Sequence, residues 1–398
     1  MTRPHPDPSA ATVAGSVDHA LAARLFAEAQ AHARAGDVGA ARQRLVQAAQ
    51  GGHLPAQWQL GLWDLIGLGA AVDVPAAVAR LRDAAGRGHL PAVVLQAQLV
   101  AAGAAGMRRD FPQVLALLLE AARGGEPSAT LQLAMLLPDA PEHAEMRSAL
   151  IRVAAAAGQP TARLLAERLP PAPPGPLPDW EAVRSRVAWP HERPLPPAQP
   201  RSEQPRVVAL PGLLSPHECV YLALKALPLL RPARIVGRDG ASVVDPIRTN
   251  EAAKFGLLEA DAVVRSLDLR VAAALGHPAE HGEGLALLRY QVGQQYLPHC
   301  DWIDPQREAN RDDLERRGQR VATCVVYLND GFEGGSTGFP KLGLELRGGV
   351  GDAFAWDNLR PDGSVEPLTL HTGRPPTSGM KYLLSKWMRD RPQAEDET

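Results

Sequence analysis

Three residues of this 398-residue chain have the types and the spacing expected of a metal site. His299 and Asp301 lie two positions apart, and His371 follows 70 residues after Asp301. In a β-strand, residues i and i+2 point to the same face, so one ion can contact His299 and Asp301 while Cys300 points away. Two imidazoles and a carboxylate form the facial triad that holds non-haem Fe(II) and leaves coordination positions open.

Taken alone, this pattern leaves other interpretations open. The chain contains 12 histidines, so a His-x-Asp pair with a distant His can arise by chance. The same three residues could hold a structural zinc ion, or they could be unrelated polar residues. The sequence around them must therefore discriminate between these possibilities.

Several sequence blocks around the three residues fall in an order typical of one enzyme family. The preceding blocks are LPGLLSPHEC (210–219), IRTN (247–250) and GEGLALLRY (282–290). The blocks that surround or follow them are YQVGQQY (290–296), GQRVATCVVYLNDGFEGGSTGFPKL (318–342), GDAFAWDN (351–358) and LHTGRPPTSGMKYLLSKWMR (370–389). Residues 206 to 389, nearly half of the chain, therefore resemble the prolyl 4-hydroxylase family of Fe(II)/2-oxoglutarate oxygenases.

This resemblance implies a double-stranded β-helix, a jelly-roll fold whose mouth holds the iron. It implies that His299, Asp301 and His371 are the metal ligands and the catalytic residues. The resemblance also assigns 2-oxoglutarate binding to Tyr290, Thr337 and Lys381, and substrate binding to Tyr296, Arg320 and Trp387. Lys381 would pair with the far carboxylate of 2-oxoglutarate, and partial burial would strengthen that pair.

The resemblance further implies a reaction. Fe(II) is the expected cofactor, 2-oxoglutarate and O2 are the co-substrates, and ascorbate is expected to support turnover. The expected enzyme hydroxylates a side chain, foremost a prolyl residue of a peptide or protein, and releases succinate and CO2. Ser336 stands where the family usually has Glu, and Arg389 stands where some members have His. These departures spare the iron site but leave a non-prolyl or small-molecule substrate as an alternative.

Other roles remain open for the domain and for single residues. One alternative is a repeat scaffold whose oxygenase domain is non-catalytic or senses 2-oxoglutarate or oxygen. The intact triad together with Lys381 argues against an inactive domain. Arg320 could instead pair with an acidic neighbour, and Trp387 could only pack. Tyr290 and Tyr296 could simply belong to the core of the barrel.

The sequence after position 206 has the pattern of a β-rich domain. Short β-type runs separated by Gly and Pro occur at ALALLRY, RVATCVVYL, DAFAWDN and KYLLSKW. Helical patterns precede them at residues 215–230 and 259–275. Helices followed by short strands predict a sandwich or barrel buttressed by helices, which agrees with the expected jelly roll.

The N-terminal part of the chain repeats itself. Gly52, Gly88, Gly125 and Gly158 follow one another at steps of 36, 37 and 33 residues, each preceded by a pair of alanines. A left-handed Gly cap and small residues between helices are typical of stacked helical hairpins, although a generic Ala-rich bundle is the alternative. The segments GHLPAQWQLG and GHLPAVVLQA resemble the Sel-one-like branch of the TPR superfamily. We therefore expect an N-terminal α-solenoid that docks a partner chain.

Proline density suggests where the chain divides. Twelve prolines fall between positions 170 and 205, which excludes a long helix or a central strand there. Only WEAVRSRVAW (180–189) could form a short amphipathic helix. The sequence thus predicts a multidomain α + β protein with repeats over 18–169, a Pro-rich linker over 170–205 and the dioxygenase domain over 206–391.

Composition limits the partners and the compartment. The 42 Lys and Arg residues nearly balance the 44 Asp and Glu residues, so we expect no nucleic-acid and no membrane partner. Three cysteines are too few for a disulfide scaffold. No apolar run reaches the ~20 residues that cross a bilayer, and the N-terminus lacks the apolar core of a signal peptide. A cytoplasmic enzyme acting on a peptide or protein is the expectation.

Overall fold

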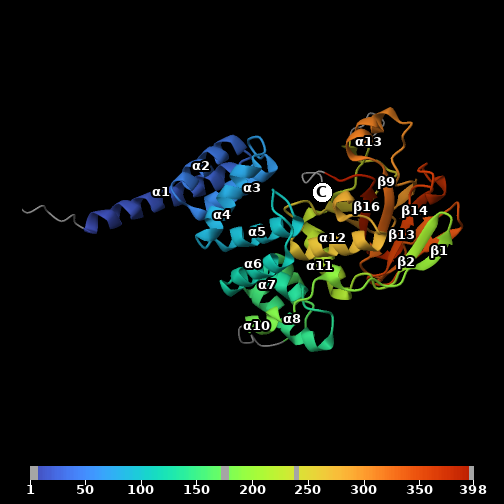
Figure 1. Cartoon of the computed structure of the whole chain (residues 1–398), viewed down its shortest axis with the longest axis horizontal. Helices are drawn as coiled ribbons and strands as arrows, with labels where there is room; N and C mark the ends of the chain where they lie inside the picture. The colour runs from blue at the N-terminus through green and yellow to red at the C-terminus, as the bar shows by residue number, and fades with distance from the viewer. Residues whose placement is uncertain (1–7, 172–178, 237–241, 394–398) are drawn as a thin grey trace, which may run out of the picture. The chain divides into compact units, whose positions relative to one another are not determined.

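The computed structural model describes residues 8–171, 179–236 and 242–393 (Figure 1). The chain forms two compact units, an N-terminal unit of residues 1–129 and a C-terminal unit of residues 130–398. None of the helices in the described ranges combines the length and the apolar character that a membrane span requires.

The N-terminal unit is built from antiparallel helical hairpins in which each helix packs against the next. Its helices are α1 (Pro8–Arg34), α2 (Val38–Gln50), α3 (Leu54–Ile66), α4 (Val74–Gly86), α5 (Leu90–Ala102) and α6 (Phe111–Arg123). The following helix, α7 (Pro127–Met135), crosses from the first unit into the second. A core of small and branched side chains, including Ala41, Leu45 and Leu60, lies between the first hairpins.

Caps at fixed spacing set the ends of these helices. Asp37, Asp73 and Asp110 each accept a hydrogen bond from a backbone N–H in the first turn of α2, α4 and α6. Such a cap satisfies a donor that the helix itself cannot pair. Their spacing of 36 and 37 residues equals that of the glycines. The helix caps therefore recur with the same period as the glycine turns.

The glycines adopt the conformation that the repeat requires. Gly52, Gly88, Gly125 and Gly158 have φ values of 80°, 86°, 93° and 97°, in the left-handed region that side chains disfavour. A Cβ at Gly61 would lie 3.0 Å from the Leu81 side chain, so helices α3 and α4 approach closely. The prediction of helical-hairpin repeats is confirmed.

Two further helices precede the β-rich part of the C-terminal unit. They are α8 (Pro141–Ala156) and α9 (Pro160–Ala166), and α9 contacts α11 (Pro216–Ala226). The Gln132 side chain accepts a hydrogen bond of 3.1 Å from the backbone N–H of Ala262 at the start of α12 (Ala262–Leu275). The residues from 130 to 169, expected to belong to the repeats, thus pack within the same compact unit as α11 and α12.

The Pro-rich segment is packed over much of its described length. It contains α10 (Trp180–Arg184) and strand β1 (Gln199–Glu203), whereas residues 172–178 lie outside the described part of the chain. Arg193 donates two hydrogen bonds to the buried Glu218 carboxylate at 2.7 and 2.8 Å. Arg270 donates to the carbonyls of Pro190, Arg193 and Pro194. Proline has no backbone N–H, so this segment has few backbone donors for its own carbonyls. The Arg270 guanidinium supplies hydrogen bonds to three of those carbonyls instead.

The β-rich part of the C-terminal unit contains two antiparallel sheets that pack face to face. The larger sheet has the order β1-β2-β13-β9-β16-β7-β6-β3, and the smaller has the order β12-β11-β14-β8. The strands of the larger sheet beyond β1 are β2 (Arg206–Leu210), β3 (Arg231–Pro232), β6 (Glu251–Lys254), β7 (Ala286–Tyr290), β9 (Arg320–Tyr327), β13 (Ala353–Asp357) and β16 (Lys381–Arg389). Those of the smaller sheet are β8 (Tyr296–His299), β11 (Thr337–Phe339), β12 (Leu344–Leu346) and β14 (His371–Gly373). Short pairs are formed by β4 (Ile235–Val236) with β5 (Ser242–Val243), and by β10 (Phe332–Gly334) with β15 (Pro376–Gly379).

The order of these strands is that of a jelly roll. Successive strands pass from one sheet to the other, since β7, β9, β13 and β16 lie in the larger sheet while β8, β11, β12 and β14 lie in the smaller. Aromatic and branched side chains fill the space between the sheets, among them Tyr327, Phe339, Phe354 and Trp356. Helix α12 covers β9 and β16 from outside (Figure 1). The expected double-stranded β-helix buttressed by helices is confirmed.

Candidate metal centre and co-substrate pocket

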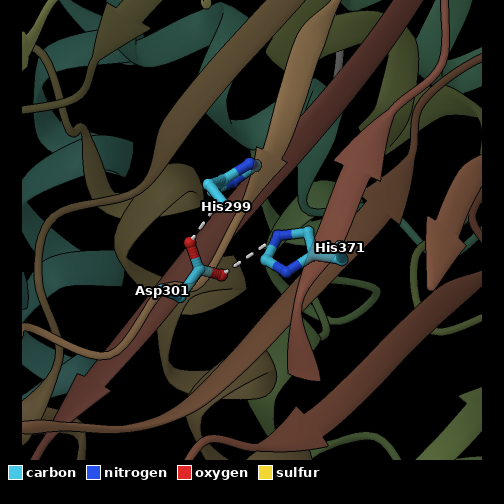
Figure 2. Close-up of side chains that lie close together, drawn as sticks. All are labelled: His299, Asp301 and His371. Carbon is cyan, nitrogen blue, oxygen red and sulfur yellow. Dashed lines mark ion pairs between the residues drawn. The ribbon is translucent and has the colours of Figure 1, made fainter. Parts of the chain in front are cut away.

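Strand pairing brings the three predicted ligands together. His299 is the last residue of β8, and His371, the first residue of β14, lies directly opposite it in the antiparallel ladder. Asp301 follows β8 after one residue and turns toward both rings (Figure 2). One ligand atom from each residue lies within 4.8 Å of the others. The long gap in sequence is therefore closed by the register of two neighbouring strands.

Hydrogen bonds leave the outer nitrogen of each ring available for a metal. Nδ1 of His299 lies 2.9 Å from the Leu297 carbonyl, and Nδ1 of His371 lies 2.9 Å from the Thr369 carbonyl. Because a carbonyl only accepts, each Nδ1 carries the proton and each Nε2 keeps its lone pair. These Nε2 atoms lie 3.8 and 3.6 Å from the two oxygens of Asp301. This is the geometry of a ligand set that an ion can occupy.

The protonation states also suit a metal. Burial, reinforced by the nearby His371, lowers the pKa of His299 to about 3, so its imidazole is neutral at neutral pH. Burial alone would raise the pKa of Asp301, but His371, His299 and Arg320 outweigh it and hold that pKa below its ordinary value. A neutral imidazole and an ionised carboxylate are the forms that bind divalent ions.

Aromatic rings enclose the centre. Tyr296 stacks on His299 with ring centroids 3.4 Å apart, and Trp356 approaches His371 edge-on at 4.8 Å. Phe339 lies 5.6 Å from the same ring. These ring contacts restrict the orientation of both imidazoles. Tyr296 therefore contacts one of the predicted metal ligands, and its role in substrate binding stays a prediction.

A small cavity opens beside the three ligands. It brings together most of the residues that the sequence singled out, and its lining includes Tyr290, Tyr296, Thr337 and Trp387 as well as the triad. Thr337 is buried, and its hydroxyl lies 3.1 Å from Oη of Tyr327. Lys381 and Arg320 are set back from this lining.

Lys381 is a buried amine that pairs with no acidic side chain in the part of the chain that the structure describes. Its side chain is fully buried, and its Nζ has no hydrogen-bond partner among the described residues. Nζ lies 5.1 Å from the ring centroids of both Tyr290 and Tyr327. Burial lowers the pKa of Lys381 to about 7. An orphaned amine in an apolar site fits a ligand that supplies a carboxylate, so the pocket suits 2-oxoglutarate.

Arg320 pairs with an acidic neighbour, which is the alternative to substrate binding stated for this residue above. Its guanidinium donates to both oxygens of Glu283 at 2.6 and 2.9 Å and lies 4.5 Å from the Trp387 ring centroid. Arg389 also donates to Glu283, at 2.7 Å. Burial alone would raise the pKa of Glu283, but the surrounding guanidiniums outweigh it and hold that pKa far below its ordinary value. The substrate-binding roles of Arg320 and Trp387 stay predictions.

Three residues of the site were not singled out from the sequence. Arg248 lines the cavity with its guanidinium 4.7 Å from the Tyr296 ring centroid. Thr323 donates a 2.9 Å hydrogen bond to Asp301, and Asn358 donates one of 2.9 Å to Thr323. Arg248 lies within the IRTN block, and the other two are polar residues in or next to apolar strands. A polar side chain in such a run is the signal that could have identified them.

Comparison with known proteins gives the family. Residues 285–389 match the family model of the 2OG-Fe(II) oxygenase superfamily. Prolyl 4-hydroxylase 1 of Arabidopsis thaliana is 34% identical over 205 residues, which cover 48% of this chain and 71% of that protein. The chain belongs to the prolyl 4-hydroxylase family of 2OG-Fe(II) oxygenases. The expected class of enzyme, a dioxygenase that uses Fe(II), 2-oxoglutarate and O2, is thereby confirmed.

Two solved structures are similar to part of this chain. The viral collagen prolyl hydroxylase of Paramecium bursaria Chlorella virus-1, solved as its 2OG complex, is 26% identical with a TM-score of 0.35. The match covers 46% of this chain and 94% of the viral one. A Sel1 repeat protein from Oxalobacter formigenes is 19% identical with a TM-score of 0.33, covering 42% of this chain and 72% of that one.

Proposed function

We propose that this oxygenase hydroxylates a prolyl residue of a peptide or protein and releases succinate and CO2 from 2-oxoglutarate. His299, Asp301 and His371 are the proposed Fe(II) ligands and catalytic residues. The observation that supports this assignment best is the pairing of His371 opposite His299, with Asp301 oxygens 3.8 and 3.6 Å from the two Nε2 atoms. Iron bound there would supply the oxidative chemistry, and the protein orients its ligands and substrates.

The proposed 2-oxoglutarate site lies along β7, β11 and β16. Lys381 would receive the far carboxylate of the co-substrate, because its buried ammonium has no other anion nearby among the described residues. Tyr290 and Thr337 line the same cavity as the three proposed metal ligands, and Nζ of Lys381 lies 5.1 Å from the Tyr290 ring centroid. A carboxylate on Lys381 would remove the cost of an unpaired buried charge and give the co-substrate one orientation.

The proposed substrate site lies at the mouth of the cavity. Tyr296 and Trp387 form its aromatic walls, and Arg320 supports Trp387 from behind. Two apolar side chains are exposed nearby: Leu297 lies within β8, the strand that carries His299, and Val292 precedes that strand. Prolyl hydroxylases act on peptide or protein substrates, and an apolar rim with aromatic walls suits a proline ring in an extended chain.

We further propose that the repeats, expected over residues 18–169, dock the substrate chain ahead of the dioxygenase domain expected over 206–391. Solenoids present extended surfaces for partner chains. Ile66 and Val72 are exposed apolar side chains of the N-terminal unit, with 52% and 57% of their surface accessible. Ile66→Glu with Val72→Glu in the full chain is expected to raise KM for long proline-rich peptides and leave KM for short ones unchanged. An equal KM for both lengths would contradict docking at these residues.

The three cysteines bear on the compartment. Cys219, Cys300 and Cys324 are all free. Free thiols are typical of a reducing environment, so a cytoplasmic location is part of this proposal.

The decisive experiment measures succinate formed from 2-oxoglutarate with Fe(II) and ascorbate under air. Wild type and His299→Ala are compared, each with and without a panel of proline-containing peptides. Succinate that depends on His299 and rises with one peptide, together with added oxygen on its proline, supports the whole proposal. Succinate that depends on His299 but ignores every peptide contradicts the prolyl substrate and favours another side chain or a small molecule. Absence of succinate despite bound metal and 2-oxoglutarate favours the sensor or scaffold.

A further inference from the structure

A buried line of hydrogen bonds leads away from Asp301 into the larger sheet. The Thr323 hydroxyl on β9 donates to Oδ2 of Asp301 at 2.9 Å. Nδ2 of Asn358, which follows β13, donates to the Thr323 hydroxyl at 2.9 Å. Thr323 and Asn358 are both fully buried. The carboxylate of one proposed metal ligand is thus tied to two neighbouring strands of the core.

The chemistry of these groups fixes the direction of both hydrogen bonds. A carboxylate can only accept, so the single hydroxyl proton of Thr323 must point at Asp301. The hydroxyl oxygen then needs a donor, and the amide nitrogen of Asn358 is one that cannot accept. Asn358 therefore prevents the Thr323 hydroxyl from rotating away from the carboxylate.

The segment that carries Asn358 also supports the second histidine. The Asn358 carbonyl accepts a 3.0 Å hydrogen bond from the backbone N–H of Glu366. The Glu366 carbonyl accepts one of 2.6 Å from the Thr369 hydroxyl, and the Thr369 carbonyl holds Nδ1 of His371. One segment, residues 358–369, thus orients both Asp301 and His371. Because both side chains are held by the same segment, the position of Asp301 relative to His371 is set by the protein without a bound metal.

We propose that Thr323, oriented by Asn358, is a positioning residue that holds Asp301 for ligation through one oxygen. This inference rests on the proposed metal site. A hydrogen bond at Oδ2 withdraws electron density from that oxygen and leaves Oδ1, 3.8 Å from Nε2 of His299, as the better ligand atom. A carboxylate that binds through one oxygen leaves more positions of the ion open than a bidentate one.

Two substitutions separate positioning from packing. Thr323→Val keeps the branched shape and loses the hydroxyl, whereas Thr323→Ser keeps the hydroxyl and loses a methyl group. If Thr323 positions Asp301, the valine variant should bind Co(II) about 10- to 100-fold more weakly, and the serine variant should bind it like wild type. Thermal stability should show the opposite order, because the buried methyl group stabilises the core. A residue that only packs would affect stability alone.

Co(II) titration of the full chain, followed by the visible absorption of the bound ion, measures both affinity and coordination. Thr323→Val is expected to change the Co(II) spectrum as the carboxylate gains freedom to bind through both oxygens. Asn358→Asp is a second, nearly isosteric test. Its carboxylate would draw the Thr323 proton away from Asp301, so Co(II) binding should again weaken in a folded protein.

The reference variant is Asp301→Ala, which removes the ligand itself. Loss of Co(II) binding in Asp301→Ala with unchanged affinity and spectrum in Thr323→Val would overturn the positioning role while the metal site stands. Wild-type Co(II) affinity in Asp301→Ala would overturn the metal site and the positioning role together. Weakened binding in Thr323→Val and Asn358→Asp, with Thr323→Ser close to wild type, supports the inference.

Discussion

Lys381 on β16 lies directly opposite Tyr290 on β7, so the two buried side chains lie on the same face of the larger sheet. The Lys381 side-chain nitrogen lies 5.1 Å from the ring centres of both Tyr290 and Tyr327. Since it has no hydrogen-bond partner among the described residues, these two ring faces are the contacts that stabilise its charged form. Burial lowers the pKa of Lys381 from 10.5 to about 7. The buried amine beside Tyr290 is therefore only partly charged at neutral pH.

This pairing predicts that 2-oxoglutarate binding takes up a proton. The co-substrate carboxylate favours the charged amine and raises the pKa of Lys381, so at pH 8 about one proton should be bound with each ligand. Affinity for 2-oxoglutarate should fall as the pH rises above 7. Calorimetry of the Mn(II)-loaded protein in buffers of different ionisation enthalpy measures the proton uptake directly.

Lys381→Met is the matched variant for that experiment. It keeps the length of the side chain and removes the amine, so 2-oxoglutarate should bind more weakly and without proton uptake. Its unfolding free energy at pH 7 should equal or exceed that of wild type, since the unfolded chain charges Lys381 more readily than the folded one. Proton uptake that persists in Lys381→Met would show that another group titrates.

The ion pair between Arg320 and Glu283 predicts a strong effect on stability. Glu283→Gln leaves Arg320 and Arg389 buried against a neutral amide, which should lower the free energy of unfolding at pH 7 by about 3–5 kcal/mol. The folded state holds the pKa of Glu283 below its ordinary value of 4.5, so this stabilisation is present above pH 4.5 and lost as the pH falls below it. Wild type and variant should therefore converge in acid.

An exposed ion pair provides the control for this prediction. Glu345 pairs with Arg374 at 2.8 Å, and both side chains are about half exposed. Glu345→Gln should change the free energy of unfolding by about 1 kcal/mol or less, because solvent screens the pair. Urea unfolding across a pH series measures both variants. Equal effects of the two substitutions would contradict the special role of burial at Glu283.

The N-terminal unit offers a separate test of helix packing. Gly61→Val places a branched side chain where Leu81 lies 3.0 Å from the Cβ position, so it should destabilise this unit by about 1–3 kcal/mol. Gly86→Ala, at a helical position with open space around its Cβ, should be neutral or stabilising. Thermal unfolding measures both variants. Turnover of short proline-containing peptides should stay unchanged in each, and a loss of that turnover would contradict independent roles for the two units.

The sequence predicted what depends on local pattern. The repeat glycines could be found because each turn needs one residue in the left-handed region, and the pattern recurs at a nearly fixed step. His299 and Asp301 could be paired because they are close in sequence. His371 was identified from a resemblance to a family, since no local rule shows that β14 lies beside β8.

The parts that escaped prediction are set by tertiary packing. Glu283 precedes Arg320 by 37 residues, and only the folded sheet brings their side chains together. The hydrogen bonds from Asn358 through Thr323 to Asp301 join two strands that meet in the larger sheet. Proline density suggested a linker at 170–205, but composition cannot show that Arg270 will satisfy the carbonyls of that segment.

The contacts of residues 130–205 predict where the catalytic unit can be cut. A fragment of residues 206–398 would lose the Gln132 cap on α12, the partner of Glu218 and strand β1 at the edge of the larger sheet. We expect it to misfold, whereas residues 130–398 should fold and bind Co(II). Near-ultraviolet circular dichroism and Co(II) titration of the two fragments measure this difference.

Arg270 gives the same prediction within the full chain. The residue is 4% exposed, and its guanidinium donates to four backbone carbonyls, those of Pro190, Arg193, Pro194 and Leu213. Arg270→Met keeps most of the apolar stem but orphans these carbonyls, and each buried acceptor without a donor costs about 1–3 kcal/mol. The variant should lower the unfolding temperature of the C-terminal unit and spare that of the N-terminal unit. A variant as stable as wild type would mean that the Pro-rich segment packs on the catalytic unit without contributing to its stability, and the 206–398 fragment should then fold.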